Sequence, residues 1–385
     1  MTQHNNYNAD KKLLSLWWWY VDESYPIDAI FTDSLKTSLD KYNYGILQYE
    51  NCLWLLGLRE KIARWAPGFF WIPEFSIDSI MITSWITAWL DLVGRYLLWW
   101  KYDAMTIEPC YDTAIMSLKR NAKTLHGIEC ENDWSGFLLL TEDNWQKIES
   151  IFRDWQTKLF YIVPNYSNPS SLSINNTDKS KLLWLCQKYW VVIFEDDPYG
   201  LYSYKNNNIV IPSFYELDKN NGNVIYANSF SKIGFPWLRI WFLIGSVEQI
   251  YEISEIQKYS ISSPNLIAQW MAEEMIKQDI FTQVFEYRKN KMESKYVNFC
   301  KFIESKSVLC SNALGLLRWG FYIWLDVGNG TIFTEEARKQ WLVVIPWKIY
   351  GNEFDYSKYI RVTFSQIHES NLEEAVNRLL SLLEK

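Results

Sequence analysis

One lysine follows two serines, with an arginine seven residues further on, in the segment Asn228-Ser-Phe-Ser-Lys-Ile-Gly-Phe-Pro-Trp-Leu-Arg239. A buried lysine amine is desolvated and loses its proton more easily, so Lys232 is suited to attack an aldehyde near neutral pH. Ser229 and Ser231 offer hydroxyl groups, and Arg239 offers a planar guanidinium, to a phosphate dianion. Taken alone, the segment is equally compatible with ordinary solvated turn residues.

Two other segments place polar residues at the ends of apolar runs of strand length. They are Val191-Val-Ile-Phe-Glu-Asp-Asp-Pro-Tyr-Gly200 and Tyr161-Ile-Val-Pro-Asn-Tyr-Ser-Asn-Pro169. In an open parallel α/β sheet, ligands bind beyond the carboxyl ends of the strands. Asn168, Asp196 and Tyr199 fall at such ends, so we expect them beside the lysine.

Together these motifs resemble the fold-type I aminotransferases of class I/II, which use pyridoxal 5′-phosphate (PLP). Within that group the chain is similar to 2-aminoadipate and kynurenine aminotransferases and to the aminotransferase domain of MocR-type regulators. The resemblance runs from about Leu14 to Glu384. It implies an α/β fold with a mostly parallel, seven-stranded-type sheet flanked by helices, plus a smaller α+β C-terminal domain. The expected division is an N-terminal arm (1–30), a large PLP-binding domain (31–275) and a small domain (276–385).

The resemblance implies a role for each residue around the cofactor. Lys232 would form the internal aldimine and carry the proton in the 1,3-transfer, with Asp196 keeping the pyridine nitrogen protonated. Asn168 and Tyr199 would hydrogen-bond the phenolic oxygen, and Tyr111 would stack on the ring. The catalytic residues implied are Lys232, Asp196 and Tyr199. The expected cofactor-binding set is Tyr49, Trp85, Ile86, Thr87, Tyr111, Asn168, Asp196, Tyr199, Ser229, Ser231, Lys232 and Arg239.

The same resemblance implies a substrate site and a partner subunit. Arg361, in Tyr359-Ile-Arg-Val-Thr-Phe-Ser365, matches the arginine that binds the substrate α-carboxylate in a bidentate pair. Asn168 and Trp18 complete the expected substrate-binding set. Tyr49 matches a tyrosine that reaches the phosphate of the neighbouring subunit, which implies a homodimer.

Some positions depart from the family pattern. Ile86-Thr87 stand where relatives often have Ser-Gln after the glycine of the phosphate helix, so one side-chain contact is lost while backbone donation remains. Asn168-Pro-Ser-Ser171 replaces the common Asn-Pro-Thr-Gly. Asp197 is expected to cap the following turn and is left out of the site. The choice between aromatic, branched-chain and acidic substrates stays open.

The chain has 22 Trp and only 15 Gly in 385 residues. At the usual frequency of about 7%, glycine should number roughly 27. The positions are more informative than the totals, because many tryptophans stand where the resemblance expects glycine or another small residue. These are Trp85 and Trp89 at the phosphate helix, Trp190 before a strand, Trp237, Trp241, Trp319, Trp347 and part of Trp17-Trp18-Trp19.

Glycine is used where φ is positive or where the backbone approaches a ligand closely. Tryptophan at a left-handed position costs roughly 1–2 kcal/mol, and an indole at Trp85 would crowd a phosphate at a helix N-terminus. We therefore hypothesise that most of these tryptophans are glycines encoded by UGA, with Trp65 and Trp324 genuine. The alternatives are an inactive pseudoenzyme and a truly tryptophan-rich protein whose aromatic residues bind a ligand.

Charge, cysteine and histidine patterns exclude several classes. A net charge of −7 without a basic block argues against nucleic acid as a partner. The six cysteines are scattered without a CxxC pair and the histidines number three, so neither a disulfide framework nor a metal site is indicated. The N-terminus is polar, and Asp91 and Arg95 interrupt the apolar stretch from Ile80 to Trp100. A cytoplasmic enzyme that does not enter a membrane is expected.

The sequence therefore predicts an aminotransferase that moves an amino group between an α-amino acid and a 2-oxo acid in two ping-pong halves through Lys232. One alternative is a PLP- or amino-acid-sensing domain of the MocR type, which needs a preceding DNA-binding module. Only about a dozen residues precede Leu14, so a free-standing enzyme is favoured. Another PLP reaction, such as that of a β-lyase or a decarboxylase, is the remaining alternative.

Overall fold

The structure is a computed structural model, and it describes residues 13–16, 25–26, 28–42, 55–132, 136–202, 211–219, 221–260, 265–304, 320–346 and 350–384. Two residues expected at the site, Trp18 and Tyr49, lie outside these ranges. The same holds for Trp17, Trp19, Trp319 and Trp347.

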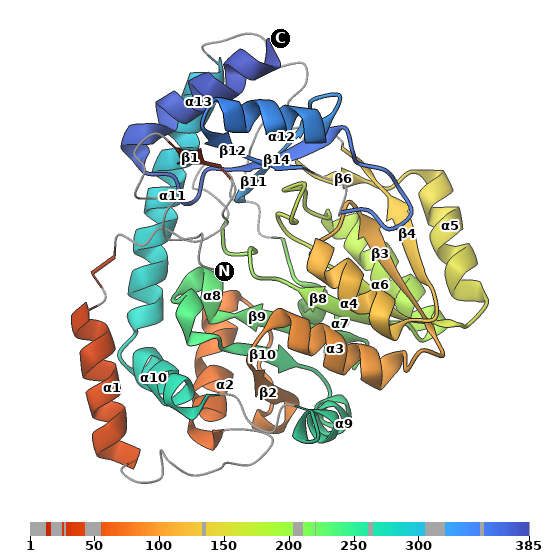
Figure 1. Cartoon of the computed structure of the whole chain (residues 1–385). Helices are drawn as coiled ribbons and strands as arrows, with labels where there is room; N and C mark the ends of the chain where they lie inside the picture. Colours follow the sequence, from red (N-terminus) through yellow and green to blue (C-terminus); the bar gives the residue numbers. More distant parts are fainter. Residues whose placement is uncertain are drawn as a thin grey trace.

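A seven-stranded sheet forms the centre of the molecule (Figure 1). Its order is β2-β10-β9-β8-β7-β3-β4, and β10 runs antiparallel to both neighbours while the other pairs are parallel. Most of its residues are buried, as expected for a sheet covered on both faces. The strands are β2 (Ile80–Thr83), β3 (Asp103–Glu108), β4 (Leu125–Glu129), β7 (Thr157–Ile162), β8 (Val192–Asp196), β9 (Val224–Ser229) and β10 (Trp241–Ile244).

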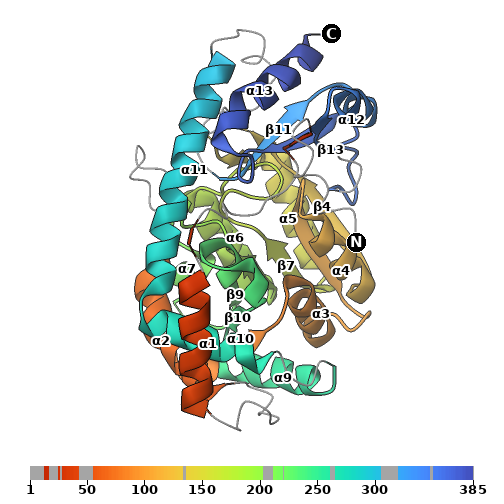
Figure 2. The same cartoon turned by 60° about the vertical axis from the view of Figure 1, so that its left-hand side comes forward.

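Helices cover both faces of this sheet (Figures 1 and 2). Helix α3 packs against α4 and α9, and α5 packs against α6, which also contacts α7. A further group, in which α10 contacts both α1 and α2, lies beside the sheet. The bounds are α1 (Asp28–Tyr42), α2 (Leu56–Phe70), α3 (Ile86–Leu97), α4 (Asp112–Asn121), α5 (Glu142–Arg153), α6 (Asn176–Tyr189), α7 (Phe214–Asp218), α9 (Val247–Lys258) and α10 (Leu266–Lys277).

A second, smaller sheet lies at the C-terminal end of the chain (Figure 2). Its order is β11-β14-β13, all antiparallel, and the N-terminal strand β1 pairs with β12 beside it. Helix α11 packs against α8 of the large sheet region and against α13, so it joins the two parts. The bounds are β1 (Leu14–Ser15), α8 (Phe230–Ile233), α11 (Ile280–Glu304), β11 (Tyr322–Asp326), α12 (Gly330–Lys339), β12 (Leu342–Val343), β13 (Ile345–Pro346), β14 (Tyr359–Thr363) and α13 (Glu369–Leu383).

The remaining described elements are short. Strands β5 (Glu131–Asn132) and β6 (Leu138–Leu139) form a two-stranded antiparallel ladder. The 3-10 turns η2 (Ile77–Ser79) and η3 (Pro236–Leu238) precede β2 and β10 respectively.

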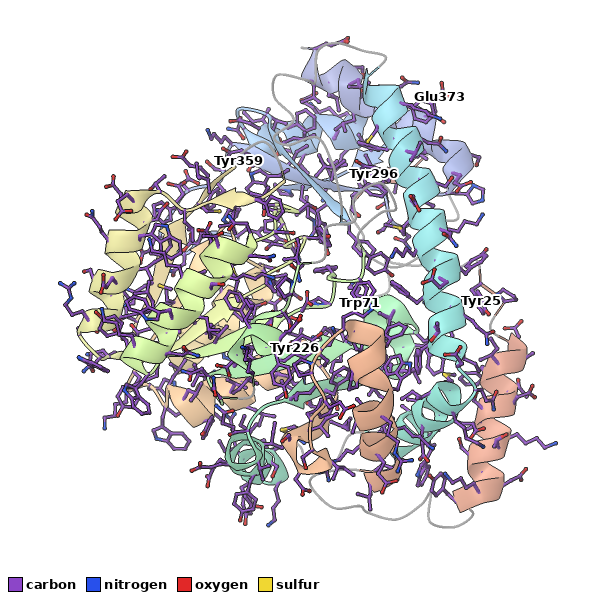
Figure 3. The ribbon with its side chains drawn as sticks, turned by 180° about the vertical axis from the view of Figure 1, so that it is seen from behind. Tyr25, Trp71, Tyr226, Tyr296, Tyr359 and Glu373 are labelled. Carbon is purple, nitrogen blue, oxygen red and sulfur yellow. The ribbon has the colours of Figure 1, made fainter. Side chains whose placement is uncertain are left out.

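Two long helices end on tryptophan in the left-handed conformation. Helix α2 ends at Trp71, with φ 54° and ψ 46°, and Figure 3 labels this residue at the end of the helix. Helix α6 ends at Trp190, with φ 57° and ψ 43°, directly before β8. The carbonyl groups of the last helical turn accept hydrogen bonds from both backbone N–H groups, which is the capping geometry that glycine usually provides.

Candidate active site

A cavity of about 210 Å³ opens at the carboxyl ends of the parallel strands β7 and β8. This is the edge where open α/β sheets bind ligands. Most of the residues expected from the sequence line it: Trp85, Ile86, Tyr111, Asn168, Asp196, Tyr199, Ser231, Lys232 and Arg239. The structure thus brings together side chains that are up to 154 residues apart in the sequence.

Lys232 lies on the short helix α8, immediately after strand β9. Ser229 caps this helix, because its side chain accepts a hydrogen bond of 3.1 Å from the Ser231 backbone N–H. The lysine is 7% exposed. Burial, then the positive charges of Arg361 and Arg239, lower its pKa to about 7, and only the Asp196 carboxylate opposes this. The amine is therefore a nucleophile near neutral pH.

Asp196 is the last residue of strand β8, and one of its two carboxylate oxygens is hydrogen-bonded to a protein side chain. The Tyr161 hydroxyl donates to its Oδ2 at 2.8 Å, whereas its Oδ1 is buried without a hydrogen-bond partner among the described residues. Burial raises the pKa of Asp196 to about 7, the Tyr161 hydrogen bond opposes this rise, and Asp197 adds to it. A buried carboxylate oxygen without a partner is costly, so this atom suits a cationic or hydrogen-donating ligand.

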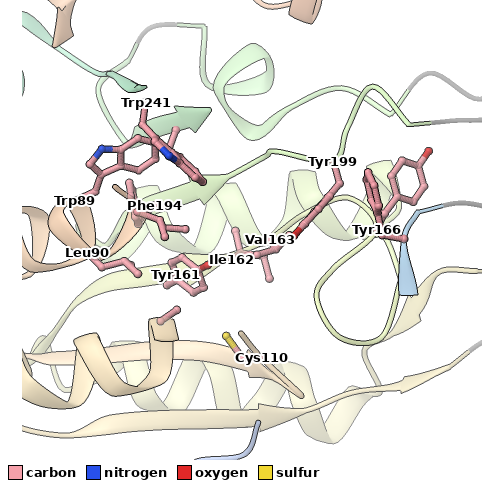
Figure 4. Packing of buried hydrophobic residues seen from close by; sticks show 14 of the residues in the cluster. Trp89, Leu90, Cys110, Tyr161, Ile162, Val163, Tyr166, Phe194, Tyr199 and Trp241 are labelled. Atoms are coloured by element: carbon pink, nitrogen blue, oxygen red, sulfur yellow. The ribbon is translucent and has the colours of Figure 1, made fainter. Parts of the chain in front are cut away.

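The sequence did not identify Tyr161. It lies on β7, where it pairs with Phe194 of β8, and Figure 4 shows it among the packed hydrophobic residues. A fully buried tyrosine usually finds a partner for its hydroxyl, and that rule is the only sequence signal that would have pointed to it. The Asp197 carboxylate, in contrast, accepts a hydrogen bond of 3.0 Å from the Asn165 side chain and another from the Gly200 backbone. These are the contacts expected of a residue that caps a turn.

Arg361 reaches the site from the second sheet. It is fully buried on β14, and its Nη1 donates to Asn168 Oδ1 at 2.7 Å. Its guanidinium carbon lies 4.7 Å from the centre of the Tyr322 ring. The hydroxyl group of Tyr322, on β11, forms a hydrogen bond of 2.7 Å with the hydroxyl group of Tyr199. Neither Tyr322 nor its pairing with Tyr199 was expected from the sequence, because 123 residues separate the two.

The end of the cavity at helix α3 carries groups that bind anions. Ile86 is the first residue of that helix, and backbone N–H groups at a helix N-terminus favour a phosphate. Ser231 contributes a buried hydroxyl that has no hydrogen-bond partner among the described residues. The guanidinium carbon of Arg239 lies only 3.0 Å from the centre of the Trp85 ring. An indole thus covers the arginine where an anion would bind.

Two other expected residues lie near this end without lining the cavity. Thr87 is half-buried one residue further along α3, and Ser229 is fully buried as the cap of α8. Both support the segments that carry the lining residues Ile86 and Ser231.

The arrangement fits a ligand with an aldehyde, a basic ring nitrogen and a phosphate. The buried Lys232 amine, with its lowered pKa, suits the aldehyde. The Asp196 oxygen without a partner among the described residues suits the ring nitrogen, and the α3 end with Ser231 and Arg239 suits the phosphate. Pyridoxal 5′-phosphate has these three groups. The fold and the cavity therefore define a PLP-dependent enzyme.

The chain belongs to the family of aminotransferases of class I and II, whose model matches residues 105–379. It is a PLP-dependent aminotransferase, as the sequence motifs predicted. It is similar to aromatic-amino-acid aminotransferase 1 of Thermococcus litoralis, at 24% identity over 94% of this chain and 86% of the relative. It is also similar to the uncharacterized HTH-type transcriptional regulator YisV of Bacillus subtilis, at 23% identity over 91% of this chain and 70% of the relative.

Solved structures confirm the fold. The kynurenine aminotransferase of Pyrococcus horikoshii superimposes with a TM-score of 0.86, at 21% identity, covering 98% of this chain and 92% of that one. In the described ranges, none of the helices has the length and apolar character needed to span a membrane. The same residues contain no group of three or more His, Cys, Asp or Glu able to hold a metal ion.

The low pKa of Lys232 predicts a pH dependence for its reaction with aldehydes. Only the neutral amine attacks, so the rate should be low below pH 7, rise through a pKa of about 7 and level off above it. The measurement is the rate at which the cofactor-free protein reacts with PLP at each pH, followed by borohydride reduction and mass analysis of the Lys232 peptide. A rate that still climbs steeply toward the ordinary lysine pKa of about 10.4 contradicts the burial argument.

Proposed function

We propose that the protein moves an amino group between an α-amino acid and a 2-oxo acid at this cavity, with Lys232, Asp196 and Tyr199 as its catalytic residues. The observation that carries the proposal is the buried Lys232 amine sharing one cavity with the Asp196 oxygen that has no hydrogen-bond partner among the described residues. When bound, PLP supplies the aldehyde that carries the amino group and a ring that withdraws electrons.

The residues of this chain divide the work of holding the cofactor. Asp196 would accept a hydrogen bond from the protonated ring nitrogen at Oδ1, while Tyr161 holds the carboxylate by donating a hydrogen bond to Oδ2. Asn168 and Tyr199 would hydrogen-bond the phenolic oxygen, and Tyr111 would lie against the ring. Ile86, Thr87, Ser229, Ser231 and Arg239 would hold the phosphate, with Trp85 and the partner's Tyr49 completing the set implied by the resemblance.

Lys232 carries protons during the reaction. Its pKa of about 7 allows the amine to take a proton from the substrate α-carbon and deliver it two atoms away, as a 1,3-transfer requires. The neutral and charged forms of the amine are close in free energy at this pKa. Its burial excludes water that would otherwise compete for the proton.

A single assay separates transamination from other PLP reactions. The protein is incubated with an aromatic, branched-chain or acidic amino acid, with and without 2-oxoglutarate. We expect formation of the 2-oxo acid to continue past one turnover only when the acceptor is present. Release of ammonia or carbon dioxide without an acceptor would instead identify a lyase or a decarboxylase.

Arg361 binds the substrate α-carboxylate in this proposal, together with Asn168 and Trp18. The replacement Arg361→Lys keeps the charge but loses the bidentate fork. Because one hydrogen bond to a charged group contributes about 1.5–3 kcal/mol, kcat/KM for the amino acid should fall roughly 10- to 150-fold. Turnover of an amine without a carboxylate should change little. An equal loss for both substrates would show that Arg361 acts only by supporting Asn168.

The proposal extends to assembly and location. The protein forms a homodimer in which Tyr49 reaches the neighbouring phosphate site, and it works in the cytoplasm. The proposed division is an arm (1–30), a large domain (31–275) and a small domain (276–385), and the presence of a seven-stranded and a three-stranded sheet supports two domains. Light scattering on the purified protein tests the dimer, and a Tyr49→Phe variant with weakened cofactor affinity would support its role.

A further inference from the structure

Tryptophan occupies the left-handed backbone region far more often than its frequency allows. In the described part of the chain, eleven residues other than glycine have positive φ, and six of them are tryptophan. These six are Trp71 (φ 54°), Trp99 (φ 46°), Trp100 (φ 57°), Trp155 (φ 61°), Trp190 (φ 57°) and Trp341 (φ 57°). Glycine is the usual residue at such positions, with Asn and Asp next, because a β-carbon collides with the backbone.

The six share a structural context as well as a conformation. Each lies just after a helix: α2, α3, α5, α6 or α12. A left-handed residue after the last helical turn is the standard position of the C-terminal glycine. Trp190 makes the matching hydrogen bonds to the carbonyls of Cys186 and Gln187. All six indoles are exposed, from 47% to 74%, so none of them is packed in the core.

Three other tryptophans lie in the packed surroundings that are usual for this residue. Trp65 stacks on Phe69, with ring centres 4.4 Å apart, inside helix α2. Trp324 is buried on strand β11 and stacks on Tyr359 at 4.9 Å. Trp145 is buried on the inner face of α5. These three have ordinary helix or strand backbone and packed surroundings, which distinguishes them from the six left-handed tryptophans.

Two tryptophans at the cavity belong with the six left-handed tryptophans for a different reason. Trp85 has an extended backbone, φ −165°, but its ring lies across Arg239 at the start of α3. Trp241 lines the cavity and packs against Trp89, with ring centres 4.8 Å apart (Figure 4). The buried indole N–H groups of Trp89 and Trp241 lack a hydrogen-bond partner within the described ranges, which is costly.

The backbone conformation at Trp237 does not favour glycine. It lies in the 3-10 turn η3, a conformation open to any residue, so the structure adds nothing to the expectation of glycine there.

We propose that the polypeptide made in its own cells has glycine at the six left-handed positions and at positions 85 and 241, because UGA codons in this gene are decoded as glycine. Trp65, Trp145 and Trp324 remain tryptophan and are encoded by UGG. With glycine at 85, Arg239 and the first N–H groups of α3 face the cavity without an intervening ring. The inference rests on backbone conformation and packing, and it stands whether or not the proposed substrate is right.

The codons of the gene give the first test. UGA at the six left-handed positions and at 85 and 241, with UGG at 65, 145 and 324, is the expected result. UGG at the left-handed positions overturns the proposal, since that codon specifies tryptophan.

Mass analysis of the protein purified from its own cells gives the second test. Trypsin releases Asp154–Lys158, which contains Trp155, and Tyr189–Lys205, which contains Trp190. Each should be lighter than its written sequence by the difference between an indolylmethyl group and a hydrogen atom. Fragment-ion sequencing across Trp324 is the matched control and should find tryptophan. Tryptophan at 155 and 190, or glycine at 324, overturns the proposal.

Discussion

Replacing Lys232 with alanine is expected to lower the rate of transamination by about four orders of magnitude or more, the upper range for loss of a positioned proton carrier. Among the described residues that line the cavity, Lys232 is the only lysine, so none of them offers a second amine. The substitution also removes the nucleophile that attaches the cofactor to the protein. The measurement is single-turnover conversion of an amino acid with saturating PLP.

A surface lysine provides the control for this substitution. Lys119 is exposed on helix α4, so Lys119→Ala should leave the rate unchanged. Borohydride reduction gives an independent measurement, because it should fix PLP to the parent protein and to Lys119→Ala but not to Lys232→Ala. If Lys232→Ala kept even one per cent of the rate, or if PLP were fixed at another lysine, the role of Lys232 would be wrong.

The sequence predicted the central strands because their apolar runs are uninterrupted. Strand β8, Val192–Asp196, lies within the segment Val191–Gly200 for this reason. Strand β4, Leu125–Glu129, has no such signal, since His126 and Gly127 break its apolar pattern. Strand β10, Trp241–Ile244, begins only after η3 and the left-handed Arg239.

The candidate site was predictable where a local motif carried it. Asp196 ends a strand, and Asn168 and Lys232 each follow one, so their common edge could be inferred from the chain. Tyr161 and Tyr322 could not, because their roles depend on which strands pair and on how the second sheet meets the first. Such contacts arise from tertiary packing and leave no spacing in the sequence.

Glycine at all six left-handed tryptophan positions is expected to stabilise the recombinant protein strongly. The left-handed conformation costs a residue with a β-carbon roughly 1–2 kcal/mol, so six substitutions should recover roughly 6–12 kcal/mol, with a smaller loss from glycine's greater freedom in the unfolded chain. That is comparable to the whole stability of a typical protein, about 5–15 kcal/mol. Urea unfolding of the chain as written and of the six-glycine chain measures the difference.

Glycine in place of a packed tryptophan, Trp145 or Trp324, should lower the free energy of unfolding instead of raising it. This contrast separates the effect of backbone conformation from a general effect of removing tryptophan. Trp145→Gly and Trp324→Gly each take away a buried ring and leave a cavity, at a cost of about 3–5 kcal/mol or more. At Trp190, 74% exposed, little packing is lost and the strain at φ 57° is relieved. If Trp190→Gly destabilised the protein as Trp324→Gly does, the left-handed indoles would be making contacts of their own and the glycine assignment would fail.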